Sequence, residues 1–235
     1  NAGSQEFKSV FIAAGEQSGE MHGAELMKEL KSQSIGSNIS FHGLGGSSMI
    51  NEGLSALYKT EELATVGFMD VIRKYGFFRK VIRDCTNFIK LNDPDVVILI
   101  DYPGLNIRLA EEIRKFYTKK IIYYISPQLW AWHEKRVLKI KRNVDKMLVV
   151  FPFEVKFYKE RDVDAVYTGH PLVKKIRQFM NDNPGRKRTF GTEKIIAVLP
   201  GSRKDEIRLH MPVLLKTLEQ LSREFDIRVN ISTAP

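Results

Sequence analysis

The segment Val96–Ile100 constrains the fold of this chain more than any other feature of its sequence. It reads VVILI, five consecutive apolar residues with no polar residue alternating between them. Such a run is typical of a parallel strand that is buried on both faces. A strand of this kind needs helices on both sides of its sheet, so we expect a chain in which strands and helices alternate.

The rest of the sequence follows that alternation. Further strand-like apolar runs occupy residues 7–14, 39–44, 121–125, 147–151, 163–167, 195–199 and 227–231. Helical spacing is found at residues 24–31, 108–117, 134–144 and 209–225. This rhythm predicts an α/β fold in which a Rossmann-type, doubly wound parallel sheet is followed by an incomplete second Rossmann-like domain.

The segment 181–192 interrupts the rhythm with the sequence NDNPGRKRTFGT, which is typical of a loop or an interdomain linker. We therefore predict a first domain over residues 6–180, a linker over 181–193 and the start of a second domain over 194–235. One or two β-α units are too few to form a stable sheet. We expect the second domain to be incomplete in this chain.

Cysteine content and apolar run length exclude several classes of protein. The only cysteine among 235 residues, Cys85, has no partner for an internal disulfide, and no cluster of Cys and His residues predicts a zinc site. The longest apolar runs have five residues, whereas a membrane-spanning helix needs about 20. We expect no signal peptide at the N-terminus, no metal and no cofactor.

The chain is basic, because 37 Lys and Arg residues against 28 Asp and Glu residues give a net charge of +9. This balance suits an anionic partner such as nucleic acid, a phosphorylated metabolite or an anionic membrane surface. The basic residues are spread along the chain and no nucleic-acid-binding motif is present, so we expect no nucleic acid partner. The simpler interpretation is that the protein is a soluble enzyme whose positive charge has no functional role.

Two glycine-containing loops follow the first two predicted strands. The first reads GEQSGE over residues 15–20, and the second reads FHGLGG over residues 41–46. Glycines at such turns let a ligand approach the backbone, and a helix N-terminus favours an anion. The spacing is not that of a dinucleotide-binding fingerprint. A tight turn with a helix cap, or a plain loop, explains the same residues without a ligand.

Asp101 follows Val96–Ile100 directly, in the sequence DYPGLN. An acid at the end of a central buried strand is costly unless it is paired or functional. Partial burial raises the pKa of a carboxyl group and suits it to act as a general base. The alternative is a helix N-cap before residues 108–117, for which Asn106 is better placed.

Three later loops also follow predicted strands. The sequence SPQLWAWH contains both tryptophans, Trp130 and Trp132. Their rings are suited either to line a sugar-binding site or to pack in the core. The sequence LPGSR places Gly201, Ser202 and Arg203 before a helix, where backbone N–H groups, a guanidinium group and the helix dipole favour an anion. The sequence TGHP over residues 168–171 is a candidate hinge.

The segment 66–82, VGFMDVIRKYGFFRKVI, holds more apolar residues than one helical face accommodates. A basic helix with surplus aromatic residues is suited to a membrane interface. The residues that we expect to contact the membrane are Phe68, Met69, Phe77, Phe78, Arg79 and Lys80. A buried pair of helices broken at Gly76 is the alternative.

In order along the chain, these motifs resemble those of the lipid-A-disaccharide synthase family. GEQSGE resembles the family's GEASGD, and FHGLGG, ILIDYPGLN, SPQLWAW, TGHP and LPGSR have counterparts as well. Departures from the family pattern are Gln17, Glu20, Ser47, Ser48 and Gly104, the last of which stands where many members carry a second acid. The resemblance covers most of the chain.

This resemblance implies a GT-B fold and an inverting transfer of diacylglucosamine from its UDP donor to 2,3-diacylglucosamine 1-phosphate, which forms a β-1,6 disaccharide. It implies a cytoplasmic enzyme, peripheral on the inner face of the bacterial inner membrane. Asp101 is the implied catalytic residue. The implied acceptor-binding residues are Gly15, Glu16, Ser18, Gly19, Gly45, Gly46, Asn106, Trp130 and Trp132. The implied UDP-donor residues are Gly201, Ser202, Arg203 and Glu206.

Two other classes remain open from the sequence. One is a different GT-B enzyme that acts on a UDP-sugar, such as a UDP-GlcNAc transferase or epimerase. The other is a basic protein that binds anions without catalysis.

Overall fold

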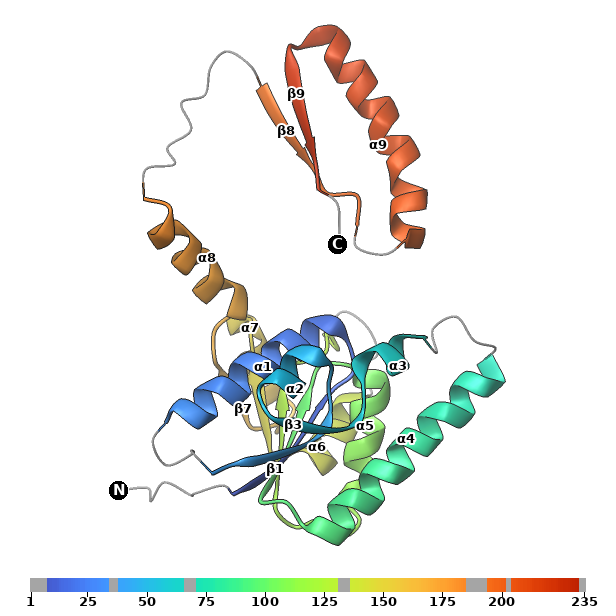
Figure 1. The fold of residues 1–235 in the computed structure, drawn as a ribbon, viewed down its shortest axis with the longest axis vertical. Helices are drawn as coiled ribbons and strands as arrows, with labels where there is room; N and C mark the ends of the chain where they lie inside the picture. Colours follow the sequence, from blue (N-terminus) through green and yellow to red (C-terminus); the bar gives the residue numbers. More distant parts are fainter. Residues whose placement is uncertain are drawn as a thin grey trace. The chain divides into compact units, whose positions relative to one another are not determined.

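The computed structural model describes residues 8–33, 38–65, 71–130, 136–184, 194–201 and 204–232. The chain divides into two compact units, residues 1–178 and residues 179–235, each of which has its own sheet (Figure 1).

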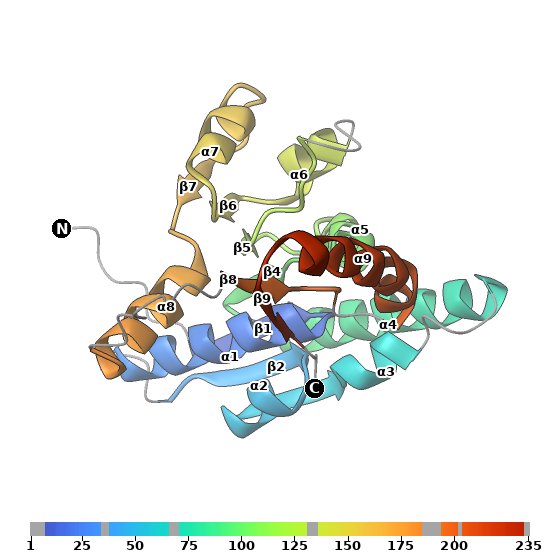
Figure 2. The same cartoon turned by 90° about the horizontal axis from the view of Figure 1, so that it is seen from above.

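Seven strands form the sheet of the first unit, all parallel to their neighbours. They are β1 (Ser9–Ala14), β2 (Ser40–Leu44), β3 (Leu54–Tyr58), β4 (Val96–Ile100), β5 (Lys120–Tyr124), β6 (Lys146–Val149) and β7 (Ala165–Tyr167). Their order in the sheet is β3-β2-β1-β4-β5-β6-β7. Figure 2 shows β4, β5, β6 and β7 following one another away from β1. The doubly wound parallel sheet predicted from the sequence is confirmed.

Helices α1 to α7 lie between the strands in the sequence and cover both faces of this sheet, whereas α8 follows the last strand and has no buried residue. They are α1 (Gln17–Ser32), α2 (Ser47–Asn51), α3 (Thr60–Thr65), α4 (Val71–Asn92), α5 (Pro103–Ile113), α6 (Val137–Asn143), α7 (Pro152–Lys159) and α8 (Pro171–Asp182). Side chains alternate between the faces of a strand, so β1 contributes to two core clusters. Val10 and Ile12 pack with Met27 of α1, whereas Phe11 and Ala13 pack in the cluster that includes α4, α5, α6 and α7.

Strand β4 lies at the centre of the first unit, and all five of its residues are buried. Val97 and Leu99 belong to one core cluster, and Val96, Ile98 and Ile100 belong to the other. This is the two-faced burial that the VVILI pattern predicts. The sequence Asp101–Tyr102 therefore emerges from the most enclosed strand of the sheet.

The second unit contains a β-α-β element of β8 (Lys194–Val198), α9 (Lys204–Glu224) and β9 (Ile227–Ile231), in which the two strands are parallel. Helix α9 includes Pro212 and leaves Leu209 and Val213 largely exposed.

Several boundaries differ from the sequence-based expectation. The helix expected from residue 24 begins at Gln17, and the helix expected from residue 108 begins at Pro103. Proline favours the first position of a helix because its φ is already helical, so α5 starts earlier than its apolar spacing indicates. The alternative of a helix pair broken at Gly76 is wrong: α4 runs unbroken through this glycine, where an added Cβ meets nothing within 4 Å.

Among the described residues, no helix combines the length and the apolar composition that crossing a membrane requires.

Candidate functional site

The candidate site lies where the order of the sheet reverses. Strands β1 and β4 are neighbours, but the chain leaves them in opposite directions, toward β2 and toward β5. Ala14 of β1 pairs with Ile100 of β4, so the residues that follow them, Gly15 and Asp101, share the carboxyl edge of the sheet. In open parallel sheets this switch point is the usual place of a ligand-binding crevice.

Asp101 has an unusual backbone conformation, which its neighbours stabilise. Its φ is 46° and that of Tyr102 is 47°, in the left-handed region that non-glycine residues rarely adopt. The N–H of Asp101 donates to the carbonyl oxygen of Tyr124 at 3.0 Å. Its own carbonyl accepts bonds from the Tyr123 hydroxyl at 2.6 Å and from Asn106 Nδ2 at 2.8 Å. Strain of this kind, on the order of 1–3 kcal/mol per residue, is commonly found at functional sites.

The electrostatic environment of Asp101 raises the pKa of its carboxyl group above the ordinary value of an aspartate. The side chain is half-buried, and this desolvation raises the pKa of its carboxyl group. The negative charge of Glu16 raises that pKa further, while a hydrogen bond from the Tyr102 backbone opposes the shift. Glu16 itself is exposed in the first loop. The site thus holds a desolvated carboxyl group beside a second, solvated one.

The ring of Tyr102, which follows β4, packs against Gly15 of the first loop. A Cβ built on Gly15 would lie 2.1 Å from Cδ1 of the Tyr102 ring, so only glycine leaves room for this ring. The next candidate residues of the loop lie in α1, where Ser18 is exposed and Gly19 is buried. Gly15 therefore has a packing role that its sequence did not reveal.

Asn106 is fully buried inside α5 and does not cap it, because the residue before the helix is Tyr102. Its Nδ2 donates to the carbonyl oxygens of Ala13 at 3.3 Å, Ile100 at 3.1 Å and Asp101 at 2.8 Å. The N-cap role considered for Asn106 and Asp101 is therefore wrong. Asn106 ties the end of β1 to the end of β4.

The second loop packs against α1 through a buried acid. Glu20 is 6% exposed, and its Oε1 accepts the backbone N–H of Ser48 at 2.7 Å. A Cβ on Gly46 would lie 2.2 Å from Oε2 of Glu20, and a Cβ on Gly45 would lie 2.5 Å from Sδ of Met49. Both glycines leave room for side chains of the chain itself.

A buried polar network at the ends of β5 and β6 was missed by the sequence analysis. Ser126 donates to Oε1 of Glu154 at 2.7 Å, and the Tyr158 hydroxyl donates to Ser126 at 3.2 Å. Oε2 of Glu154 accepts the backbone N–H of Phe151 at 3.0 Å. The helix that positions Glu154 could have been predicted from the sequence, because Pro152 and Glu154 are typical of the first turn of a helix.

Trp130 lies at the surface, 44% exposed, and not in the core. Its ring meets Phe153 edge-on with centroids 5.2 Å apart, and Phe153 stacks on Phe151 at 5.8 Å. The His170 ring lies 5.4 Å from Phe151. These rings follow β5, β6 and β7, so they gather at the carboxyl edge of the sheet. Trp132 lies outside the described residues.

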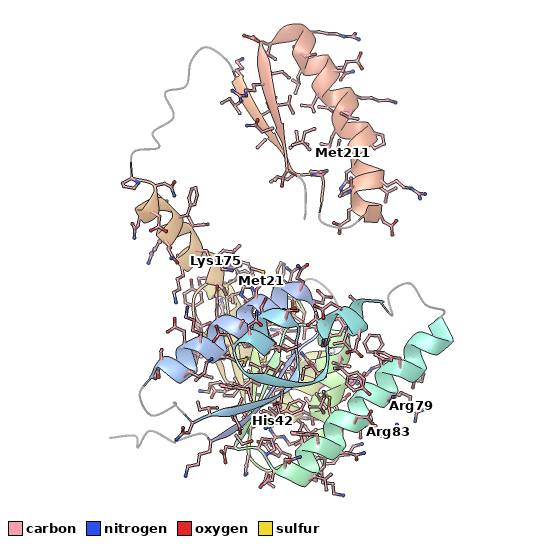
Figure 3. The ribbon with its side chains drawn as sticks, in the orientation of Figure 1. Met21, His42, Arg79, Arg83, Lys175 and Met211 are labelled. Carbon is pink, nitrogen blue, oxygen red and sulfur yellow. The ribbon has the colours of Figure 1, made fainter. Side chains whose placement is uncertain are left out.

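The segment expected at a membrane is only partly exposed. Phe77 packs edge-on against Tyr58 at 5.9 Å, and Phe78 contacts the core cluster. Arg79 and Lys80 are exposed on α4, and Figure 3 labels Arg79 with Arg83 one turn further along. Phe68 and Met69 lie outside the described residues.

In the second unit, Gly201 has a φ of 130°, and a Cβ there would lie 2.8 Å from Cβ of Glu206. Glu206, in the first turn of α9, therefore packs over this glycine. His210 Nδ1 donates to the carbonyl oxygen of Pro200 at 2.8 Å, a contact that the sequence did not indicate. Ser202 and Arg203 lie outside the described residues.

Solved structures with a similar fold are UDP-sugar enzymes. A co-structure of Staphylococcus aureus MnaA with UDP matches with a TM-score of 0.65 and 13% identity, covering 97% of this chain and 63% of that one. A putative UDP-N-acetylglucosamine 2-epimerase from Listeria monocytogenes matches with a TM-score of 0.65 and 8% identity, covering 98% and 64%. At these identities the likeness concerns the fold alone, and it confirms the predicted GT-B-like class.

Sequence relatives are more specific. Lipid-A-disaccharide synthase 1 of Legionella pneumophila strain Philadelphia 1 is 42% identical over 216 residues, 91% of this chain and 56% of the relative. Lipid-A-disaccharide synthase of Geobacter sulfurreducens is 39% identical over 219 residues, 92% of this chain and 56% of the relative. The chain thus spans about half the length of the curated relatives it matches. The family model of lipid-A-disaccharide synthetase matches residues 10–233, and this chain belongs to that family.

Proposed function

We propose that the protein is a glycosyltransferase that forms the β-1,6 disaccharide of lipid A. Its donor would be UDP-2,3-diacylglucosamine, its acceptor 2,3-diacylglucosamine 1-phosphate, and its second product UDP. Family membership supports this reaction. The observation that carries the proposal is Asp101, a desolvated carboxyl group at the switch point of the sheet.

Asp101 is the proposed general base. Its carboxylate accepts the proton of the acceptor 6-hydroxyl as that oxygen attacks the anomeric carbon, opposite to UDP. The bond from the anomeric carbon to the diphosphate oxygen breaks, its electron pair leaves with UDP, and the configuration inverts. A raised pKa brings the carboxylate closer to the basicity that proton transfer near neutral pH requires.

The proposed acceptor site surrounds Asp101. Glu16 acts on the pKa of Asp101, which supports a place for the first loop beside the reacting hydroxyl. Trp130 offers an exposed ring face of the kind that packs on a sugar. Asn106 is buried, so we assign it a positioning role and no contact with the acceptor.

Residues 194–235 would begin the UDP-holding domain. Gly201, Ser202 and Arg203 precede the 21-residue helix α9, and a helix N-terminus favours the negative charge of a diphosphate. We propose that Arg203 and the loop amides stabilise the leaving UDP, and that Glu206 supports the loop by packing over Gly201.

We also propose that the protein docks on the anionic inner face of the inner membrane. Tyr75, Arg79 and Lys80 are exposed on α4, and each basic residue near such a surface contributes about 1 kcal/mol. Phe77 and Phe78 pack inward, so Tyr75 replaces them as the described aromatic residue for this contact.

The test is the reaction of the full-length protein with UDP-2,3-diacylglucosamine and 2,3-diacylglucosamine 1-phosphate. We expect UDP and one disaccharide by mass spectrometry, with the large H1–H2 coupling of a β-linkage by NMR. An α-linkage would contradict inversion. Epimerisation of UDP-GlcNAc without any disaccharide would assign the protein to the other class of UDP-sugar enzyme.

A further inference from the structure

The peptide group between Asp101 and Tyr102 is held by donors from two different elements. The carbonyl oxygen of Asp101 accepts a hydrogen bond from the Tyr123 hydroxyl of β5 at 2.6 Å and another from Asn106 Nδ2 of α5 at 2.8 Å. On the other side of the residue, the N–H of Asp101 donates to the carbonyl oxygen of Tyr124 at 3.0 Å. The backbone of Asp101 is therefore bonded both before and after its Cα atom, and both of its dihedral angles are constrained.

The register of the sheet brings the Tyr123 hydroxyl to this carbonyl group. Tyr123 pairs with Leu99 across β4 and β5, so Asp101 lies two residues, or about 6.6 Å, further toward the carboxyl edge. The long side chain of a tyrosine spans this distance inside the sheet's core. Tyr123 is fully buried, and its ring packs in the core cluster that includes residues of α4, α5, α6 and α7. A phenylalanine would fill the same space but would offer no donor.

Asp101 needs this support because its conformation is unfavourable. Its φ of 46° is followed by a φ of 47° at Tyr102. Residues other than glycine visit the left-handed region as single residues, because their Cβ atom then lies too close to a carbonyl oxygen. If the peptide group lost its donors, it would be free to rotate toward an ordinary conformation. Such a rotation would also turn the carboxyl group of Asp101 away from its present direction.

The Tyr123 hydroxyl stays protonated throughout the pH range in which a protein is assayed. Its burial, and after that the negative charge of Asp101, raises the pKa of this hydroxyl well above its ordinary value. The hydroxyl therefore acts as a permanent hydrogen-bond donor to the carbonyl group. It has no role as an acid or a base in a reaction.

We infer that Tyr123 is a positioning residue for the proposed general base, because its hydroxyl holds the Asp101 carbonyl and thereby directs the Asp101 carboxylate at the acceptor hydroxyl. The inference rests on the proposed function, which assigns the base to Asp101. Asn106 does not replace this bond. Its Nδ2 carries two hydrogens for three carbonyl oxygens, those of Ala13, Ile100 and Asp101, whereas Tyr123 donates one short bond.

The experiment compares two Tyr→Phe variants of the full-length enzyme. Tyr123→Phe removes the hydroxyl and keeps the ring. The matched control is Tyr117→Phe, because Tyr117 is also buried and donates to a backbone carbonyl, that of Pro94, at 2.8 Å. Pro94 precedes β4 and thus lies at the opposite edge of the sheet. Both variants lose one buried hydrogen bond of the same kind, so thermal unfolding should show similar losses of stability.

Steady-state kinetics with the UDP-sugar donor distinguishes their effects on the reaction. We expect Tyr123→Phe to lower kcat at least about tenfold, because a small displacement of a catalytic group has a large effect on rate. The KM for the UDP-sugar should stay within about twofold, and Tyr117→Phe should keep kcat within about twofold. Tyr123→Met, which fills the core without a hydroxyl, is the second variant and should lower kcat as much as Tyr123→Phe.

A double variant tests whether Tyr123 acts through Asp101. When the carboxylate has been removed by Asp101→Asn, there is no base left to position. Adding Tyr123→Phe should then change the residual kcat by less than about twofold, since residues that act as a unit are strongly non-additive.

Three results would each overturn the inference: a folded Tyr123→Phe variant with kcat within twofold, equal losses of kcat in Tyr123→Phe and Tyr117→Phe, or the same loss from Tyr123→Phe with and without the Asp101 carboxylate. Failure of the proposed base gives a different result, because Asp101→Asn would then keep a near-normal kcat. If Asp101→Asn loses activity and Tyr123→Phe keeps it, the inference about Tyr123 fails alone.

Discussion

The contact between Glu20 and Gly46 allows a double-mutant cycle whose magnitude follows from the structure. Gly46 has a φ of −100°, which alanine adopts without strain, so Gly46→Ala acts through its new Cβ alone. That Cβ would lie 2.2 Å from Oε2 of Glu20 and must displace the buried carboxylate from the Ser48 N–H. A hydrogen bond to a charged group contributes about 1.5–3 kcal/mol. We expect Gly46→Ala to lower the free energy of unfolding by about 2 kcal/mol.

Urea unfolding followed by tryptophan fluorescence measures this loss in the first unit, because Trp130 and Trp132 both belong to it. With a urea m-value of about 2 kcal/mol per molar, the midpoint should fall by about 1 M. Glu20→Ala removes the same hydrogen bond and should cost a similar amount. Because both changes break one contact, the double variant should be little worse than either single variant. Additive losses, or an unchanged midpoint in Gly46→Ala, would refute this reasoning.

Three further predictions concern the first unit. Burial raises the pKa of the Asp101 carboxyl group in the folded state, so the folded protein binds more protons than the unfolded chain between the two pKa values, and stability falls as pH rises through that window. Asp101→Asn should therefore raise the midpoint of urea unfolding at pH 7.5 and raise it less at pH 4.5. Burial raises the pKa of the Cys85 thiol from 9.0 to about 12, so very little reactive thiolate is present at pH 8 in the folded chain. Iodoacetamide labelling, measured by mass spectrometry at pH 8, should therefore be at least about a thousandfold slower in the folded chain than in the unfolded chain. Tyr75→Ser with Arg79→Gln and Lys80→Gln should reduce sedimentation with anionic vesicles at least about tenfold, whereas unchanged sedimentation would place the membrane contact elsewhere.

The sequence predicted the central sheet because burial on both faces leaves a direct pattern. Val96–Ile100 has no polar position, and this pattern alone predicts that Asp101 lies at the end of a strand. The order of the strands in the sheet was not predicted. Strand β3, with the sequence LSALY, and the short helices α2 and α3 were not expected, because their apolar patterns are too short to stand out.

The details of the site depend on contacts between residues far apart in the sequence. Asn106 was expected to bind the acceptor, with a helix cap as the alternative, yet it is buried and bonded to Ala13, 93 residues away. The apolar count of residues 66–82 predicted surplus exposed rings, but no count shows that Tyr58 and the core take up Phe77 and Phe78. The acid Glu20 and the glycine Gly46 were each noted separately, and only the fold brings them together.

Turnover of Asp101→Asn in the full-length enzyme tests the central claim most directly. The account predicts that kcat falls by about two to four powers of ten, the usual contribution of a general base, while the protein stays folded and the KM for the UDP-sugar changes little. The circular dichroism spectrum and the urea midpoint provide the fold control. A folded variant with near-normal kcat would contradict the account and would leave Asp101 as a structural residue at the end of β4.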